Sequence, residues 1–435
     1  MTARYKLLNN VLGWIIFLVA AIVYISCIEP TASFWDCGEY IACCNKLEVG
    51  HPPGAPTFLI IGRFFSLFAK DPAHIAACVN TMSALASAGT ILFMFWSMTL
   101  LGKRLVKAMK QELTDSRMYA IFGSAVIGSL AYAFSDSFWF SAVEGEVYGM
   151  SSFFTALVFW AILRWDADDS ERADRWLVLI AYMIGLSIGV HLLNLLTIPS
   201  IVFIYYFKKH QPTRSGLLIT SLVAVGLLGV VQNGIIPGVV STAANYELLF
   251  VNGFSLPFNS GTIIYFALLL GMIITGLQYS MKGGRNLFRN FVVVASTFFL
   301  FTVIGAFAYS KVLMSVLTAA GAGYLIYKIR DNRVLLNTIL VSFSVFLMGY
   351  STFLILVIRS KANTPMDENN PENAISLLSY LNREQYGDWP IAYGPYYNAP
   401  LDPDDPADDG TPVYAQDIRS GDYAIIDARK QTNYN

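Results

Sequence analysis

The sequence predicts an all-α polytopic membrane protein with about eleven transmembrane helices and a large first extracytoplasmic loop that contains short interfacial helices. The first observation is composition, since 55% of the 435 residues are hydrophobic and 14% are charged, whereas a soluble domain usually carries about 25% charged residues. The second is the recurrence of long apolar runs, and the third is the concentration of Lys and Arg in alternate loops. The net charge of −1 gives no reason to expect a nucleic-acid partner.

The apolar runs have lengths close to the roughly 20 residues that cross a bilayer as a helix. The candidate spans are Leu8–Ile28, Ile75–Leu101, Met118–Phe138, Tyr148–Leu163, Trp176–Val190, Leu193–Phe207, Leu217–Ile236, Thr262–Met281, Phe291–Ala308, Val312–Tyr327 and Leu335–Ile358. The two runs on either side of His191 are short, and a single re-entrant hairpin there would leave the topology unchanged. The first run is too long for a typical signal peptide and lacks a small-residue cleavage site, so we expect it to be retained.

The basic side chains assign the loops to the two sides of the membrane, because cytoplasmic loops carry an excess of Lys and Arg. With the N-terminus in the cytoplasm, the five inner loops contain Lys103, Arg104, Lys107, Lys110, Arg117, Arg164, Arg172, Arg175, Lys208, Lys209, Arg214, Lys282, Arg285, Arg289, Lys328, Arg330 and Arg333. The outer loops after the first contain only Lys311. The first two outer loops and the segment after Ile358 are therefore expected on the extracytoplasmic side.

The composition changes near residue 358. We expect residues 1–358 to form a transmembrane catalytic domain and residues 359–435 to form a polar extracytoplasmic tail, the start of a soluble domain that is cut short. Within this tail, Pro371–Arg383 predicts one amphipathic helix with a proline in its first turn. Tyr423–Asp427 has the pattern of a strand.

The first outer loop contains the side chains best suited to chemistry. Asp36 and Glu39 are three positions apart and would share one helix face, where they would act as a general base and its partner or would only cap a helix. His51 precedes two prolines that fix the backbone, so it would be held ready to donate to a phosphate oxygen, or it is an ordinary loop histidine. Arg63 lies in the apolar segment Thr57–Phe68, which is too short to span, and must reach the interface or bind an anion.

The second outer loop adds Glu144 and Glu146, just before the apolar run that starts at Tyr148. Acids at a helix N-terminus are stabilised by the helix dipole by about 0.3–1 kcal/mol, but acids close to lipid also indicate a polar cavity. His191, at the outer end of the fifth run, is either a satisfied core residue or a ligand. Sugar transfer outside the cytoplasm requires a lipid-linked donor, a group that binds its phosphate and a carboxylate base, and these two loops supply such groups.

Three stretches resemble the motifs of a known family. They are Phe34-Trp35-Asp36-Cys37-Gly38-Glu39-Tyr40 followed by Gly50-His51-Pro52-Pro53-Gly54 and Pro56, then Ala142–Tyr148, and then Gly185–Asn194. The family consists of polytopic proteins common in Bacteroidetes-type bacteria and related to an animal transmembrane O-mannosyltransferase, and it resembles the GT-C class of glycosyltransferases. The resemblance covers roughly residues 8–210, and the tract Tyr393-Gly394-Pro395-Tyr396 is also similar.

The resemblance implies a glycosyltransferase that moves mannose or another hexose from a polyprenyl-phosphate donor to Ser or Thr of exported proteins, at the periplasmic face of the bacterial inner membrane. It implies that the acidic motif of the first outer loop, here Asp36 and Glu39, is catalytic. We expect Asp36 to be the general base with Glu39 beside it, and His51 and Arg63 to hold the donor phosphate. The sugar or acceptor pocket is expected to contain Glu144, Glu146, Tyr148, His191 and Asn194. No cofactor is expected, and a divalent metal is not favoured; the expected partners are the lipid-linked sugar, the acceptor protein and membrane lipid.

Two other classes of function also fit the sequence. A lipid-linked sugar transporter or flippase would place its charges near the middle of the membrane, whereas these charges cluster toward one surface. A non-catalytic membrane subunit of an export or assembly complex would use the outer loops for docking. In that case the acids could be replaced without loss of an enzymatic activity.

Overall fold

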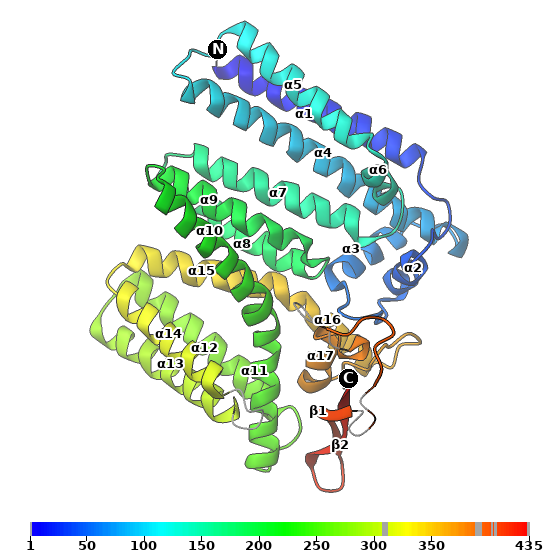
Figure 1. Ribbon diagram of the computed structural model, residues 1–435, viewed down its shortest axis with the longest axis vertical. Helices are drawn as coiled ribbons and strands as arrows, with labels where there is room; N and C mark the ends of the chain where they lie inside the picture. The colour runs from blue at the N-terminus through cyan, green and yellow to red at the C-terminus, as the bar shows by residue number, and fades with distance from the viewer. Residues whose placement is uncertain (1, 307–311, 388–393, 402, 404–406, 433–435) are drawn as a thin grey trace. The chain divides into compact units, whose positions relative to one another are not determined.

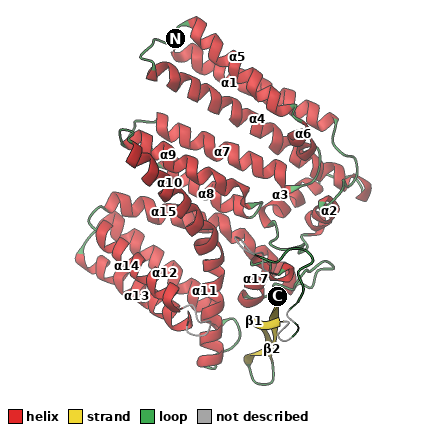
Figure 2. Cartoon of the chain, in the orientation of Figure 1, coloured by secondary structure: helices red, strands yellow, loops and turns green. Residues whose placement is uncertain are grey.

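The structure is a computed structural model that describes all residues except 1, 307–311, 388–393, 402, 404–406 and 433–435. Within this described part the regular structure is almost entirely helical, and its one sheet is a two-stranded hairpin near the C-terminus (Figure 2). The residues fall into two units, which are described separately. Unit 1 comprises Met1–Gly50, Gly54–Gln232 and Val341–Asp367, and unit 2 comprises His51–Pro53, Asn233–Leu340 and Glu368–Asn435.

Unit 1 is built from long apolar helices joined by short helices at their ends (Figure 1). Its helices are α1 (Thr2–Ser26), α2 (Cys37–Lys46), α3 (Pro56–Ser66), η1 (Pro72–His74), α4 (Ile75–Ala108), α5 (Asp115–Ala133), α6 (Asp136–Ala142), α7 (Val147–Ala167), α8 (Arg175–Ile188), η2 (Leu192–Leu196), α9 (Thr197–Lys209), α10 (Arg214–Gly229), η6 (Ser351–Phe353) and α16 (Leu354–Lys361). The second half of α15 (Arg333–Tyr350) also belongs to this unit, and the π-helix η3 (Val230–Ile235) crosses the boundary between the two units.

The helices support a polytopic membrane protein. Seven helices of the described chain are long and apolar enough to cross a bilayer, or eight if α5 and α6, which are bent by 68° at their junction, form one span. The predicted runs beside His191 correspond to α8 and α9, which have 14 and 13 residues and are short for a complete span. The count of eleven therefore stays a prediction. The expectation that the segment around Arg63 is too short to span is confirmed, since α3 has 11 residues.

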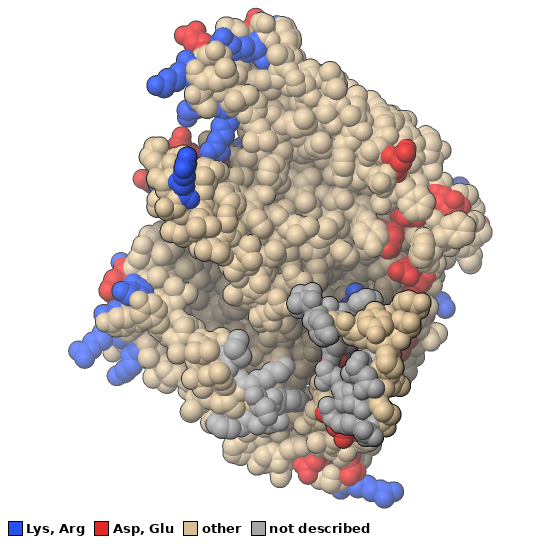
Figure 3. All heavy atoms as spheres, in the orientation of Figure 1, with Lys and Arg blue, Asp and Glu red and all other residues tan. Residues whose placement is uncertain are grey.

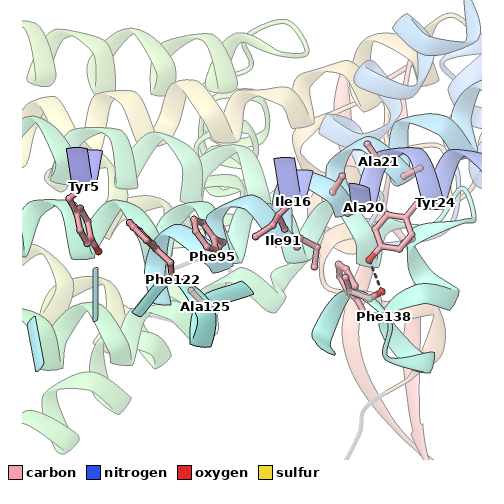
Figure 4. Packing of buried hydrophobic residues seen from close by; sticks show 14 of the residues in the cluster. Tyr5, Ile16, Ala20, Ala21, Tyr24, Ile91, Phe95, Phe122, Ala125 and Phe138 are labelled. Atoms are coloured by element: carbon pink, nitrogen blue, oxygen red, sulfur yellow. Dashed lines mark hydrogen bonds between the residues drawn. The ribbon is translucent and has the colours of Figure 1, made fainter. Parts of the chain in front are cut away.

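The core of unit 1 is formed where α1 packs against α4 and α5 (Figure 4). Aromatic side chains such as Phe95 and Phe122 fill the space between these helices together with several buried alanines. Two buried tyrosines also satisfy helix carbonyls: the Tyr5 hydroxyl donates to the carbonyl of Thr99 at 3.0 Å, and the Tyr24 hydroxyl donates to the carbonyl of Ala133 at 2.8 Å. Buried hydroxyls need such partners because an unpaired one is costly in an apolar environment.

Basic side chains gather at one end of unit 1. Arg4 of α1 pairs with Asp115 of α5 at 3.2 Å, and Arg104 of α4 pairs with Asp166 of α7. Lys208 of α9 donates to the carbonyl of Trp165 at 2.6 Å. In this unit, Figure 3 shows blue side chains where α4 meets α5 and where α7 ends, and red ones at the opposite end. The loops assigned to the two sides from sequence thus lie at opposite ends of this unit.

Helices α8 and α15 approach closely within unit 1 because glycines face each other. A Cβ on Gly185 would overlap the backbone carbonyl of Phe346, and a Cβ on Gly349 would lie 2.5 Å from the backbone nitrogen of Leu186. Small residues at helix crossings allow backbones to approach in this way inside membranes. The crossing fixes α8, which leads directly into the segment that contains His191.

Unit 2 contains a second group of helices and the C-terminal segment. Its elements are α11 (Ile236–Leu248), the π-helix η4 (Leu249–Gly253), α12 (Ser260–Lys282), α13 (Arg285–Ala306), α14 (Val312–Ile329), the first half of α15, α17 (Ala374–Leu381), η7 (Glu384–Tyr386), β1 (Ala407–Asp417) and β2 (Asp422–Thr432). The Glu247 carboxylate on α11 accepts hydrogen bonds from the backbone and hydroxyl of Thr262 at 2.9 and 3.0 Å. This carboxylate therefore satisfies the first turn of α12.

The predictions for the tail are confirmed where the structure describes them. The amphipathic helix is α17, and it begins later than predicted because Asn373 and Ser376 form a capping box. The predicted strand lies within β2 (Asp422–Thr432), which pairs with β1 in antiparallel register. Tyr393 of the tract that resembles the family lies outside the described residues. The predicted division at residue 358 stays a prediction.

Candidate functional site

Asp36 immediately precedes α2 but does not cap it. Its backbone is helical (φ −81°, ψ −2°) and its carboxylate makes no capping hydrogen bond, although its carbonyl accepts from the Tyr40 N–H at 2.9 Å. The preceding Trp35 adopts a left-handed φ of 62°, which is unusual for a bulky side chain. Helix capping normally requires an extended backbone at the cap residue. The capping interpretation therefore does not account for Asp36.

Glu39 lies in the first turn of α2. A Cβ on Gly50 would overlap its Oε1 atom, so the carboxylate rests against the α-carbon of Gly50. Gly50 ends the chain segment that returns from α2 and leads to the proline-rich stretch. A glycine at this position gives the Glu39 carboxylate the space that it occupies.

The loop that contains α2 and the loop between α6 and α7 meet around Cys37 and Tyr40 of α2. The pKa of the Cys37 thiol is raised to about 12, mainly by burial and in addition by the carboxylates of Glu144 and Glu146. The pKa of the Tyr40 phenol is also raised far above its usual range. Burial is the largest cause, and the charges of Glu146, Asp36 and Glu39 add to it. Because carboxylates from both loops act on the same two side chains, the four acids form one electrostatic cluster.

Glu144 is a buried acid of this cluster. Glu144 is 4% exposed. This burial raises the pKa of its carboxyl, although hydrogen bonds with Ser33 and Cys37 counteract part of that effect. Burial disfavours the charged form of a carboxyl. Glu144 therefore retains its proton to a higher pH than an exposed glutamate and can donate a hydrogen bond in its neutral form.

This raised pKa predicts a pH dependence for the stability of the protein. A carboxyl whose pKa is higher in the folded state stabilises the fold below its unfolded pKa, and the contribution is lost as the pH rises through the folded value. Relative to Glu144→Gln, which stays neutral, the wild-type chain should lose stability as the pH rises above about 4.5, by about 1.4 kcal/mol for each pKa unit. Thermal unfolding of both chains in detergent at several pH values measures this. Parallel pH profiles would contradict the assignment.

Glu146, in contrast, does cap a helix. Its backbone is extended (φ −121°, ψ 155°), and its Oε2 accepts a hydrogen bond from the N–H of Val147 at the start of α7, at 3.2 Å. Between the two acids, a Cβ on Gly145 would lie 2.8 Å from Oδ1 of Asn80 on α4 and 3.1 Å from Ile41 on α2. The second loop therefore packs directly on α2 and α4.

The third motif places His191 beside the second loop. The rings of His191 and Tyr148 have centroids 5.4 Å apart. Nδ1 of His191 accepts a hydrogen bond from the N–H of Leu193 at 3.1 Å, so that nitrogen carries no proton in this arrangement and Nε2 carries the proton of the neutral ring. Asn194 is fully buried, and its Nδ2 donates to Oγ of Ser187 at 2.8 Å. Asn194 therefore stabilises the turn that presents His191.

The proline-rich stretch and the His191 motif are joined at the start of α3. The N–H groups of Thr57 and Phe58 donate to the carbonyl of Gly189 at 2.7 and 3.3 Å. The Thr57 hydroxyl donates to the carbonyl of Leu186 at 2.9 Å. The N-terminus of α3 thereby satisfies the C-terminal carbonyls of α8, which the helix itself leaves without partners. Two motifs that are more than 100 residues apart in the sequence thus support each other.

The two residues predicted to hold phosphate, Arg63 and His51, belong to different units. Arg63 is half-buried, and its Nη1 donates to the backbone carbonyl of Asn45 and to Oδ1 of Asn45 at 3.2 Å, at the C-terminal end of α2. His51 belongs to unit 2, where its backbone carbonyl accepts from the hydroxyl of Tyr380 at 3.2 Å. Phosphate binding by either residue stays a prediction.

The sequence interpretation missed two features of this site. Tyr40 was not selected, although it follows Glu39 directly in the first motif. Arg359 was not selected either, because its position 312 residues after Leu47 gives no local signal of the hydrogen bond between them. The five cysteines are all free thiols, and Cys37, Cys43 and Cys44 are buried.

Comparison with known proteins shows what this region is similar to. Residues 36–214 match the model of the "Protein O-mannosyl-transferase TMEM260 N-terminal domain". This part of the chain is related to the protein O-mannosyl-transferases. The protein O-mannosyl-transferase tmem260 of Dictyostelium discoideum is 22% identical over 227 residues, which cover 49% of this chain and 26% of that protein. The chain thus spans about a quarter of the length of this relative, and no solved structure matches it.

The relation predicted from the sequence motifs is confirmed by this match. The matched region begins at Asp36 and contains every residue that was selected as a candidate for the site. These residues are Asp36, Glu39, His51, Arg63, Glu144, Glu146, Tyr148, His191 and Asn194.

Proposed function

We propose that this chain is a membrane glycosyltransferase that moves mannose or another hexose from a polyprenyl-phosphate donor to Ser or Thr hydroxyls of exported proteins. The observation that carries the proposal is the meeting of carboxylates from two outer loops around Tyr40, in the region related to the O-mannosyl-transferases. We further propose that this end of unit 1 faces the periplasm of a bacterium, with the basic end in the cytoplasm, because Lys and Arg favour the cytoplasmic side.

In the proposed reaction Asp36 is the general base. Its carboxylate accepts the proton of the acceptor hydroxyl as the oxygen bonds to the anomeric carbon of the sugar, and the bond between that carbon and the phosphate oxygen breaks. The polyprenyl phosphate leaves with the electron pair. Asp36 suits this role because its carboxylate is not used to cap α2, and a positioned base typically contributes about 10²–10⁴ in rate.

The remaining candidates have binding roles in this proposal. His51 would stabilise the charge on the leaving phosphate, whereas Arg63, which is bonded to Asn45 at the other end of α2 from Asp36, would support that helix. Glu144, whose carboxyl has a pKa raised by burial, would form a hydrogen bond with a sugar hydroxyl. Tyr148 and His191, whose rings lie side by side, would form a wall of the sugar pocket, while Glu39 would orient the acceptor. Glu146 and Asn194 would maintain the backbone around that pocket.

The position of the charges favours an enzyme over a flippase. In unit 1 the four acids lie in or beside short segments at the ends of long helices, at α2 and between α6 and α7. A transport path would need such groups along the length of the spans. A cluster at the ends of the spans, near the membrane surface, is the expected arrangement for chemistry on a lipid head group.

We propose that the reaction requires no divalent metal. Magnesium and similar ions need about six oxygen ligands, of which carboxylates must be charged. Burial raises the pKa of the Glu144 carboxyl and Glu146 is bonded to the N-terminus of α7, so these two acids are poor ligands for such an ion. Transfer activity should therefore be unchanged, within about twofold, after treatment with excess EDTA. Loss of activity with EDTA that manganese or magnesium restores would show that this prediction is wrong.

Binding of the donor separates this proposal from the docking-subunit alternative. The purified chain in lipid nanodiscs should bind a radiolabelled polyprenyl-phosphate hexose and should not bind the corresponding nucleotide sugar. Unlabelled polyprenyl phosphate should displace the label because it retains the phosphate and the lipid chain. Failure to bind any lipid-linked sugar would favour a non-catalytic subunit.

A further inference from the structure

The C-terminal end of α2 is held by two arginines. The last turn of a helix exposes carbonyls that have no partner within the helix, and here Leu47 ends the helix in a left-handed conformation. Nη1 of Arg63 donates to the carbonyl of Asn45. Nη2 of Arg359 donates to the carbonyl of Lys46 at 3.1 Å, and its Nε donates to the carbonyl of Leu47 at 2.7 Å. Three successive carbonyls are thereby paired with guanidinium groups.

The chain around Arg359 also follows the end of α2. Arg359 lies in the last turn of α16, and the Ser360 hydroxyl donates to Oδ2 of Asp367 at 3.1 Å. The N–H of Val49 donates to the carbonyl of Met366 at 3.0 Å, and Val49 and Asp367 form an isolated parallel bridge. The segment from Arg359 to Asp367 therefore contacts the end of α2 at several points, although it follows the last predicted span.

We propose that Arg359 is a positioning residue for the reaction. It acts together with Arg63 at the C-terminal end of α2, and so sets the position of Asp36 and Glu39 at the other end of this ten-residue helix. Cations at a helix C-terminus complement the helix dipole, and the planar guanidinium of arginine bonds two adjacent carbonyls at once, which lysine does not reproduce. The reaction role rests on the proposed function, whereas the restraint on α2 does not.

Hydrogen exchange tests the restraint without an activity assay. In Arg359→Gln, backbone amides of α2 should exchange about tenfold faster than in the wild type, because the last turn opens more often. Amides of α4 and α7 should keep their exchange rates. Arg359→Lys should lie between the two, since it retains the charge but not the paired geometry. Lys361→Gln, an exposed position on the same helix, is the control and should match the wild type. Unchanged exchange in α2 of Arg359→Gln would overturn the proposal.

Kinetics then test the link to the chemistry. Arg359→Gln should lower kcat by about tenfold to a hundredfold through misplacement of Asp36, with little change in KM for the lipid-linked donor. In an Asp36→Asn background the same substitution should have no further effect on the residual rate, because the group that it positions is already lost. Faster exchange with unchanged kcat, or an equal loss in both backgrounds, would overturn the positioning role. If the wild-type chain transfers no sugar, the proposed function fails and the exchange result alone decides whether Arg359 restrains α2.

Discussion

Asp36→Asn should lower kcat for sugar transfer by about 10²–10⁴. The amide has almost the same shape as the carboxylate but does not accept a proton from the acceptor hydroxyl. The substitution removes no cap from α2 and keeps the size of the side chain, so donor binding should be retained. Steady-state transfer from a polyprenyl-phosphate hexose, together with the thermal unfolding temperature of both chains, measures this.

Asp136→Asn is the matched control for that experiment. Asp136 is an exposed acid in the first turn of α6, and we assign it no role in the reaction. Its amide variant should retain the wild-type kcat. Undiminished turnover by Asp36→Asn would exclude Asp36 as the base, and equal losses in both variants would indicate a general effect of charge at this surface.

Gly185→Ala should strongly destabilise the fold. The added methyl group would overlap the backbone carbonyl of Phe346, and neither helix backbone can move without separating α8 from α15. Overpacking of this kind typically costs about 1–3 kcal/mol. The thermal unfolding temperature in detergent should fall accordingly.

Gly226→Ala provides the comparison for Gly185→Ala. Gly226 is also in a helix, α10, but a Cβ there would have no neighbouring atom within 4 Å. Alanine should be neutral or stabilising at this position by up to about 1 kcal/mol, because it favours the helix more than glycine does. If both variants unfold at the wild-type temperature, α8 and α15 do not pack as closely as described.

The sequence was informative wherever the physical signal is local. Apolar runs predicted the long helices, and the composition of the tail predicted α17 and β2. Loop charges predicted which connections share an end, and the ion pair between Arg4 and Asp115 agrees with that assignment in unit 1. The short helices beside His191 were harder to predict because the apolar run continues through a break that His191 and Asn194 stabilise with local hydrogen bonds.

Some features of the candidate site have no local signal in the sequence. Asp36 and Glu146 both precede a helix, and the sequence gives both the same two interpretations. The backbone decides between them, since Glu146 is extended and caps α7 whereas Asp36 is helical and does not cap α2. The role of Arg359 depends on a contact across more than 300 residues, which no pattern within one segment reveals.

The most direct test of the account is the release or transfer of labelled sugar from a polyprenyl-phosphate hexose by the purified wild-type chain. An acceptor peptide that contains Ser and Thr is present in one reaction and absent from the other. We expect the wild-type chain to transfer the label to the peptide hydroxyls, and to hydrolyse the donor slowly when the peptide is absent. Asp36→Asn should do neither. If the wild-type chain binds the donor but does not cleave it, the proposed glycosyltransferase activity is wrong. Equal turnover by Asp36→Asn would exclude Asp36 as the general base.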